Sequence, residues 1–267
     1  MPRRRPSHVL LVTFLTCGLA PLGLGLSATP AVAAPTAATV SSTASPTSPL
    51  VGSTLVLRGS VRPARTGSPI IAQQSTSRGW IKVASSTTSS TGQYALRVRG
   101  FGPGRHVYRV AAPATPKYSA GYSRSMAVTA YRWRLLLDVS PVPDGYQPTN
   151  DTLTLAGKQY TRSLGWTYGS NDAAHTFDLT GKGCKQLLTL AGAENAPSDS
   201  TNEFDYTVQG AGSPTWQRQL TGSATAQLST SLASVNRFAL NFKSVATGQA
   251  GASPHAGFGR PEVLCAS

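Results

Sequence analysis

The segment from Trp166 to Asp172 combines the residue types with which proteins bind sugars. It reads Trp-Thr-Tyr-Gly-Ser-Asn-Asp and therefore sets two aromatic rings beside amide and carboxylate groups. An aromatic ring can lie under the C–H face of a sugar while polar side chains meet its hydroxyls, and Trp and Tyr lose little conformational entropy in doing so. Loops at one end of a rigid scaffold commonly carry such sites. The predicted ligand-binding residues are Trp166, Tyr168, Asn171, Asp172, His175 and Trp216.

Two of these aromatic residues have a structural alternative. Trp166 follows a glycine in a predicted strand, where a Trp commonly belongs to the core. Trp216 stands among turn and charged residues and either stacks on a sugar or packs within a sandwich. The sequence leaves both alternatives open.

No motif in the chain fixes a catalytic site. A glycoside hydrolase needs two carboxylates held across the scissile bond, and no motif pairs the acids here. The G-x-S-x-G setting of a serine hydrolase, Gly-rich phosphate loops and the His-Glu-x-x-His zinc helix are absent from the sequence. His175 and Asp178 are three residues apart, which in a strand places them on opposite faces. We expect no enzyme.

Three acidic residues between positions 194 and 203 suggest one metal site. Calcium takes six to eight oxygens, often from clustered carboxylates and carbonyls. Glu194, Asp199 and Glu203 are close enough in sequence to contribute, although no EF-hand spacing is present. The alternative is an ordinary acidic loop, so calcium is the one candidate cofactor.

The first 33 residues have the layout of a secretory signal peptide. Three arginines (3–5) precede an apolar run (8–26), and Ala31-Val32-Ala33 is a small-residue cleavage site. A membrane span is the weaker alternative, because the apolar run is interrupted by polar residues, Gly and Pro. Thr16 before Cys17 argues against a lipoprotein, and Pro6 with the absent Phe-Leu-Lys pattern argues against twin-arginine export. We predict an extracellular protein with no membrane span, with association with a cell wall as a further prospect.

Removal of the signal leaves two cysteines, Cys184 and Cys265. In an exported chain they most simply form one disulfide. It would close a loop of roughly 80 residues, which the chain-entropy model values at about 4–5 kcal/mol. A metal site needs further ligands, and a catalytic thiol needs a free cysteine.

Charge divides the chain near residue 130. Residues 35–130 contain eleven Lys and Arg and no acid, whereas residues 131–267 contain ten of each sign. This step predicts two modules. The basic module either has an ordinary solvated surface or attracts an anionic cell-wall polymer or acidic polysaccharide, with binding that falls with salt. Export and the lack of a recognition motif argue against nucleic acid.

The basic module is predicted to be a β-sandwich of immunoglobulin type over residues 51–130, after a flexible or polyproline-like leader (34–50) with room for a short edge strand. Apolar residues alternate with polar ones in several short runs, and turn clusters separate these runs. The motifs V-L-R-G-S-V-R-P-A (56–64), G-W-I-K-V-A (79–84), S-T-G-Q-Y-A-L-R-V (90–98) and G-R-H-V-Y-R-V (104–110) resemble the immunoglobulin-like repeats of exported actinobacterial proteins. The resemblance implies a spacer or adhesive module with Tyr108 in its core, and we expect Trp80 there as well.

Residues 131–267 are also strand-rich, with candidate strands at 131–139, 152–155, 174–179, 186–190, 203–208 and 237–242. The motifs L-T-L-A-G-K-Q-Y-T-R-S-L-G-W (153–166), H-T-F-D-L-T-G-K-G-C (175–184), L-L-T-L-A-G-A-E (187–194), E-F-D-Y-T-V (203–208), V-N-R-F-A-L-N-F (235–242) and G-F-G-R-P-E-V-L-C (257–265) resemble the NPCBM/NEW2 domain, a carbohydrate-binding module family found beside glycoside hydrolases. The resemblance implies a galactose-binding-like jelly roll.

The chain departs from the NPCBM/NEW2 pattern at two places. Family members commonly have an acidic pair where this chain has Gly192-Ala193-Glu194-Asn195. They often have His after the glycine at the position where this chain has Trp166. Binding residues and a calcium site therefore do not carry over by position. The sequence predicts a secreted, non-catalytic, all-β protein whose C-terminal jelly roll binds a glycan. The alternative is a structural or adhesive surface protein that binds another protein or an anionic cell-wall polymer.

Overall fold

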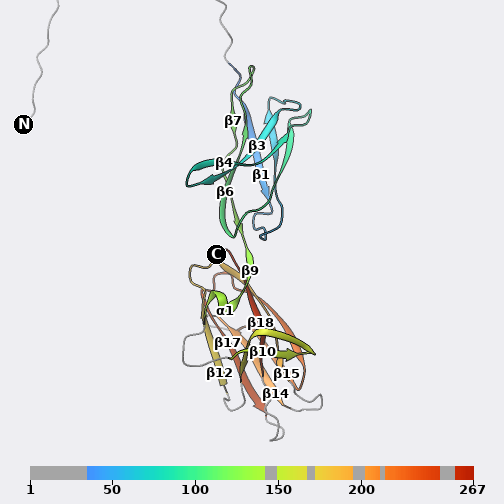
Figure 1. Cartoon of the computed structure of the whole chain (residues 1–267), viewed down its shortest axis with the longest axis vertical. Coiled ribbons are helices and arrows are strands. Elements are labelled where there is room, and N and C mark those ends of the chain that lie inside the picture. Colours follow the sequence, from blue (N-terminus) through green and yellow to red (C-terminus); the bar gives the residue numbers. More distant parts are fainter. Residues whose placement is uncertain (1–34, 142–148, 167–171, 195–201, 211–213, 247–255) are drawn as a thin grey trace, which may run out of the picture. The chain divides into compact units, whose positions relative to one another are not determined.

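The structure is a computed structural model that describes residues 35–141, 149–166, 172–194, 202–210, 214–246 and 256–267 (Figure 1). Nearly all regular structure in these residues is β-strand, which confirms the all-β prediction. Four antiparallel sheets form two sandwiches, one on each side of residue 131. No helix in the described part of the chain is long and apolar enough to cross a membrane.

The N-terminal sandwich packs a three-stranded sheet against a five-stranded sheet. The first sheet has the order β1-β2-β5, with β1 (Thr39–Ser45), β2 (Leu55–Arg62) and β5 (Gln93–Val98). The second has the order β4-β3-β6-β7, with β8 also pairing with β6; its strands are β3 (Pro69–Thr76), β4 (Gly79–Thr87), β6 (Gly104–Ala112), β7 (Gly121–Tyr122) and β8 (Met126–Ala130).

Alternating apolar residues build the core of the N-terminal sandwich. In β5 the side chains of Tyr94, Leu96 and Val98 are buried while the residues between them are exposed. Tyr108 is fully buried, as expected. Trp80 does not belong to this core cluster, and the prediction that it does is wrong. Its side chain lies on the outer face of β4, because Trp80 pairs with Ser75 in a row that faces away from the core.

The strand β1 lies inside the segment expected to be a leader. It pairs with β2 over seven consecutive residues, and Val40 is buried. The hydroxyl of Tyr94 crosses β2 at Gly59 and donates a hydrogen bond of 2.6 Å to the carbonyl of Ser41. From Thr39 onward this segment is therefore part of the sandwich, and the edge strand is longer than its polar composition suggests.

The C-terminal sandwich packs a six-stranded sheet against a four-stranded one. The larger sheet has the order β10-β11-β18-β13-β16, with β9 pairing with β18; its strands are β9 (Arg132–Leu135), β10 (Thr149–Leu155), β11 (Lys158–Trp166), β13 (Cys184–Ala193), β16 (Thr225–Ser231) and β18 (Ala256–Cys265). The smaller has the order β12-β17-β14-β15, with β12 (Asp172–Asp178), β14 (Glu203–Gln209), β15 (Pro214–Thr221) and β17 (Arg237–Ala246). The strand predicted at 131–139 ends early, because Leu136–Val139 forms the short helix α1.

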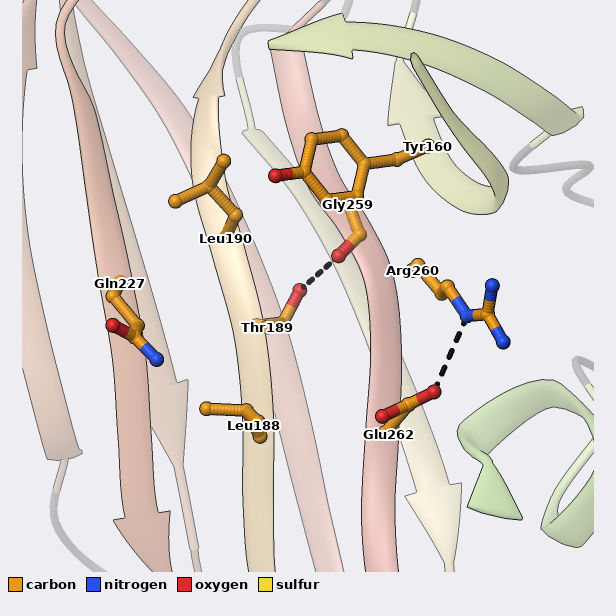
Figure 2. Close-up of a pocket in the computed structure, with 8 residues that line it drawn as sticks. All are labelled: Tyr160, Leu188, Thr189, Leu190, Gln227, Gly259, Arg260 and Glu262. Carbon is orange, nitrogen blue, oxygen red and sulfur yellow. Dashed lines mark hydrogen bonds and ion pairs between the residues drawn. The ribbon is translucent and has the colours of Figure 1, made fainter. Parts of the chain in front are cut away.

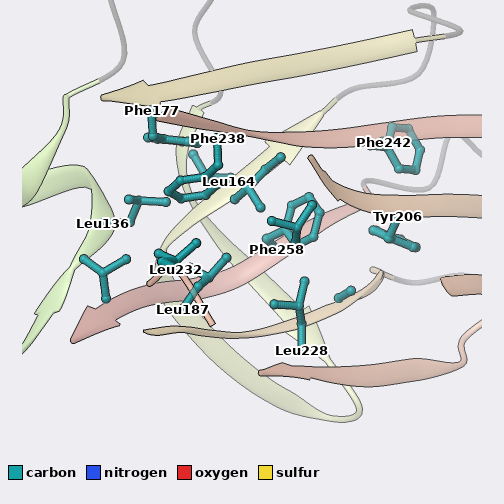
Figure 3. Close-up of a cluster of buried hydrophobic side chains, with 14 of the residues drawn as sticks. Leu136, Leu164, Phe177, Leu187, Tyr206, Leu228, Leu232, Phe238, Phe242 and Phe258 are labelled. Carbon is teal, nitrogen blue, oxygen red and sulfur yellow. The ribbon is translucent and has the colours of Figure 1, made fainter. Parts of the chain in front are cut away.

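Aromatic and aliphatic side chains from both sheets fill the space between them, as Figure 3 shows. Phe177 stacks on Phe238 with ring centroids 5.5 Å apart. Tyr206 meets Phe258 edge to face at 5.5 Å, an arrangement that aromatic quadrupoles favour. Burial raises the pKa of the Tyr206 hydroxyl, so this ring remains neutral at any ordinary pH.

The predicted disulfide is confirmed. Cys184 and Cys265 are bonded across the neighbouring strands β13 and β18, at a sequence separation of 81. The bond cross-links two strands of one sheet near the C-terminal end of the chain. Nearby, the amide of Ala266 donates to the carbonyl of Gly183 at 3.3 Å, which adds a hydrogen bond to the same link.

The hairpin of β10 and β11 folds over the outer face of the larger sheet. β11 pairs with β18 only through its last three residues, so the rest of the hairpin leaves the plane of the sheet. Leu153 and Leu155 are fully buried, yet they lie outside the main core cluster. They cover glycines of the outer face, where a Cβ at Gly257 would stand 2.9 Å from Leu153 and one at Gly259 would stand 3.0 Å from Leu155. Glycine is needed because a side chain would fill this space.

Candidate functional site

A hollow of about 330 Å³ lies beside this hairpin, on the outer face of the larger sheet. Figure 2 shows the ring of Tyr160 over β18 at Gly259, with Gln227 of β16 across the hollow and Arg260 and Glu262 on its flank. Leu188 and Leu190 of β13 supply its apolar floor. Ligand pockets begin near this size and combine apolar walls with a few placed polar groups.

A bulge in β18 brings the polar flank into position. Leu190 pairs with Gly259 and Leu188 pairs with Glu262, so Thr189 alone faces the two residues between them. Arg260 has φ 42°, in the left-handed region that non-glycine residues rarely adopt. Bulges of this kind re-aim side chains beside binding sites. Here the bulge places Gly259 and Glu262, which are three residues apart, on the face that carries Leu188 and Leu190.

Buried hydroxyls hold the bulge and the hairpin together. The Ser163 hydroxyl donates to the carbonyl of Tyr160 at 2.6 Å and accepts from the amide of Arg260 at 3.0 Å. The Thr189 hydroxyl donates to the carbonyl of Gly259 at 2.9 Å. Ser163 is fully buried, so these hydrogen bonds are shielded from water. The Ser163 side chain therefore links the backbone of Tyr160 to the backbone of Arg260.

Two oppositely charged side chains, Arg260 and Glu262, line the hollow and form an ion pair. The Nε of Arg260 lies 3.2 Å from Oε1 of Glu262, and their side chains are 53% and 30% exposed. Solvent-exposed pairs of this kind add little stability. They do hold a donor group and an acceptor group ready at the rim. Lys158 does not line the hollow, but its Nζ lies 5.1 Å from the centroid of the Tyr160 ring.

A second hollow, of about 490 Å³, lies on the outer face of the smaller sheet. Its polar lining consists of Asp205, Thr207, Gln209, Gln217, Asn241 and Lys243. Asn241 donates to the side-chain oxygen of Gln209 at 3.2 Å. Phe242 also borders this hollow, but its ring is only 7% exposed, so it offers little platform for a ligand. The first hollow is the better candidate because it combines an aromatic ring with polar groups.

The predicted binding loop falls largely outside the described residues. Tyr168 and Asn171 are not among them, and their role stays a prediction. Trp166 and Asp172 mark the last residue of β11 and the first residue of β12, where only the backbone is described. Trp166 pairs with Ala256 of β18, next to Gly257.

The other two predicted contacts face the core. His175 is 5% exposed and lies on the buried side of β12 together with Phe177; desolvation lowers its pKa. Trp216 is partly buried and packs against the main core cluster, which corresponds to the sandwich-packing alternative. Neither residue lines either hollow.

Two of the three acids proposed for calcium lie in the described residues, and each accepts a hydrogen bond from a neighbouring residue. A carboxylate oxygen of Glu194 accepts the amide of Thr154 at 2.9 Å, whereas Glu203 accepts from Gln219 at 3.0 Å. Asp199 lies outside the described residues. Within the described ranges no group of three or more His, Cys, Asp or Glu side chains could hold a metal ion. The calcium site through Glu194, Asp199 and Glu203 therefore stays a prediction.

Sequence reasoning missed Tyr160, Arg260 and Glu262. All three lie in strands rather than in a polar-aromatic loop. A signal was present in the paired glycines Gly257 and Gly259, which mark a close approach to the strand that carries Arg260 and Glu262. Which segment covers those glycines depends on how the hairpin folds, and the chain order does not show this.

Comparison with known proteins defines no relative. No known family model matches the sequence, and no curated protein matches it. The resemblance to NPCBM/NEW2 and to immunoglobulin-like repeats thus stays a prediction.

Solved structures with a distant likeness include carbohydrate-binding modules. The CBM51-2 and INT domains of Clostridium perfringens ZmpB match with a TM-score of 0.39 and 9% identity, over 61% of this chain and 37% of that one. A carbohydrate-binding module of the β-sandwich superfamily matches at 0.32 and 11% identity, over 88% and 98% of the two chains. A tandem repeat from the extending region of a large adhesion protein matches at 0.29 and 12% identity, over 73% and 65%. The chain thus spans well under half of the first of these structures, and TM-scores this low assign no function.

Proposed function

We propose that this chain is a secreted, non-catalytic carbohydrate-binding protein that takes a neutral sugar in the hollow beside Tyr160. The observation that carries the proposal is the combination of one aromatic ring, an apolar floor and a donor–acceptor pair within a single hollow. A sugar has the matching surfaces, since its ring carbons form weakly apolar faces and its hydroxyls both donate and accept.

Each group in the hollow has a role in this proposal. Tyr160 and Leu190 meet the C–H face of the sugar. Arg260 donates to a hydroxyl oxygen, Glu262 accepts from a neighbouring hydroxyl, and Gln227 can do either. The fixed position of Tyr160 lowers the entropic cost of binding, because the ring is seated on Gly259 before a ligand arrives.

Export, which the first 33 residues predict, would bring the chain to extracellular glycans. The disulfide between Cys184 and Cys265 fits an oxidising compartment, in which cytosolic reductants are absent. The N-terminal sandwich then serves as the spacer or anchor predicted from its sequence.

A glycan array on the folded, disulfide-bonded full chain tests the proposal, followed by calorimetry with the best sugar. Gln227→Ala removes one exposed hydrogen-bonding group and should weaken binding about two- to tenfold, the usual worth of one hydrogen bond. Tyr160→Ala should weaken it more than about tenfold, because it removes the platform, whereas Tyr160→Phe should keep most of the affinity.

Gln217→Ala is the matched control, since Gln217 is an exposed glutamine that borders the second hollow instead. Equal losses for Gln217→Ala and Gln227→Ala would remove the hollow at Tyr160 from the proposal. A blank array with protein whose melting is cooperative would reject carbohydrate binding and favour the adhesive alternative, which a pull-down of a protein partner would then support.

A further inference from the structure

Three side chains from strands β4, β6 and β7 of one sheet in the N-terminal sandwich form one stack. The guanidinium of Arg109 in β6 lies 4.2 Å from the ring centroid of Trp80 in β4 and 4.3 Å from that of Tyr122 in β7. Its Nε donates a hydrogen bond of 2.8 Å to the side-chain oxygen of Gln73 in β3. The guanidinium is therefore held by two rings and an amide.

The stack lies on the outer face of the five-stranded sheet. Tyr108 and Val110 are fully buried, so Arg109 between them points to the other side of β6. Gln73 pairs with Arg109 on one side and with Lys82 on the other, which sets Lys82, Gln73 and Arg109 in one row across three strands.

Further cationic and apolar groups share this face. Arg105 is four residues before Arg109 in the same strand and is exposed. Tyr122 is 54% exposed, so much of its ring remains open while Arg109 lies over it. We call the set Trp80, Lys82, Arg105, Arg109 and Tyr122 the Arg109 face.

No carboxylate of the same module can neutralise the Arg109 face. Residues 35–130 contain eleven Lys and Arg and no Asp or Glu. Arginine has five N–H donors, and the single bond to Gln73 uses the one on Nε, so the two Nη atoms carry the other four. The two Nη atoms lie in one plane and can donate two parallel hydrogen bonds to a carboxylate. Because the two rings and Gln73 already hold the guanidinium, less conformational entropy is lost when the carboxylate binds.

We propose that the Arg109 face binds an acidic polysaccharide, with a sugar carboxylate on Arg109 and the sugar ring against Tyr122. Lys82 and Arg105 lie on the same face and attract further carboxylates of the polymer. Charge complementarity selects an anion, and the exposed ring beside the cation selects one built of sugar rings rather than a linear phosphate polymer. The proposal does not depend on the hollow beside Tyr160.

The test uses the full chain and polygalacturonate as the probe, with binding measured by calorimetry at low salt and at 0.5 M salt, at which the screening length is roughly 4 Å. Arg109→Gln should weaken binding about tenfold, because it removes a charge-assisted two-point contact. Tyr122→Ser should weaken it about threefold through loss of the ring contact. Tyr160→Ala in the other sandwich should change nothing.

Arg97→Gln is the matched control. Arg97 is an exposed arginine of β5 in the opposite sheet, so this variant lowers the net charge by the same amount without touching the Arg109 face. It should weaken binding less than about twofold. Equal losses for the two arginine variants would show diffuse charge attraction and overturn the proposal. So would an unchanged affinity for Tyr122→Ser, or binding of polyphosphate or a single-stranded oligonucleotide as tight as that of polygalacturonate.

Discussion

Gly259 decides where the ring of Tyr160 rests, and Gly259→Ala tests this seating. A Cβ on this residue would stand 3.0 Å from Cδ1 of Leu155 and 3.1 Å from Cγ of Tyr160. Carbon atoms pack best at about 3.5–4.0 Å, so both neighbours would be compressed. Leu155 is fully buried and has no free space, whereas Tyr160 is only partly buried. The ring of Tyr160 must therefore be the group that moves.

The expected change in the free energy of unfolding combines steric compression in the folded chain, which destabilises, with lost freedom of the unfolded chain, which stabilises. An added methyl in a filled site costs about 1–3 kcal/mol. Replacing glycine by alanine also removes freedom from the unfolded chain and returns about 0.4–1 kcal/mol where the backbone conformation allows. Gly210→Ala isolates this gain, because a Cβ there would meet its nearest atoms at 3.5 and 3.6 Å, which is ordinary contact.

Thermal melting and glycan binding measure the two consequences. Gly259→Ala should melt below Gly210→Ala by about 2–4 °C for each kcal/mol of compression. It should also weaken the sugar that binds in the hollow, whereas Gly210→Ala should not. If Gly259→Ala melts at or above Gly210→Ala and binds the sugar as the unaltered chain does, Tyr160 does not rest on Gly259 and the hollow has another shape.

Two further predictions concern the C-terminal sandwich. Replacing Cys184 and Cys265 together by alanine should lower the free energy of unfolding by about 4–5 kcal/mol, because the bond closes a loop of 81 residues; denaturation with and without reductant measures this, and equal midpoints would contradict it. Desolvation lowers the pKa of His175 below its unfolded value near 6.5, so the unfolded chain binds the proton more readily. Stability should be greatest above about pH 6.5 and fall as the pH drops below it, and His175→Gln should flatten this fall in melts taken between about pH 5 and 8. An unchanged pH profile for His175→Gln would remove this residue as the cause.

Periodicity in the sequence was enough to predict about half of the strands. In β14 apolar and polar residues alternate strictly, in β5 large apolar residues occupy every second position, and both strands bury these side chains. The predicted strand over 131–139 fails at its end, because Leu136 and Val139 turn their apolar side chains to the core from a single helical turn. β15 and β16 were missed, since polar residues fill most of both strands.

The sequence did not predict the residues of the candidate site for a different reason. Composition pointed to the polar-aromatic segment after Trp166, yet the described hollow draws its groups from four strands that lie far apart in the sequence. The same holds for Arg109, whose two ring partners follow only from the pairing of β6 with β3 and β7 and of β3 with β4. Local sequence specifies which face of a strand a side chain occupies, but the order of strands in the sheet decides its neighbours.

The bond between Cys184 and Cys265 also has a mechanical consequence. A force that pulls on the two ends of the chain passes from Cys184 through the sulfur atoms to Cys265, and the 81-residue loop between them carries no tension. At roughly 3.3–3.6 Å for each residue, about 270–290 Å of chain is withheld from extension. Three of the four strands that build the hollow beside Tyr160 lie inside that loop. The disulfide would therefore keep β13, β16 and β18 from being pulled out when force is applied to the ends of the chain. Single-molecule stretching with and without reductant would show the withheld length as a difference in contour.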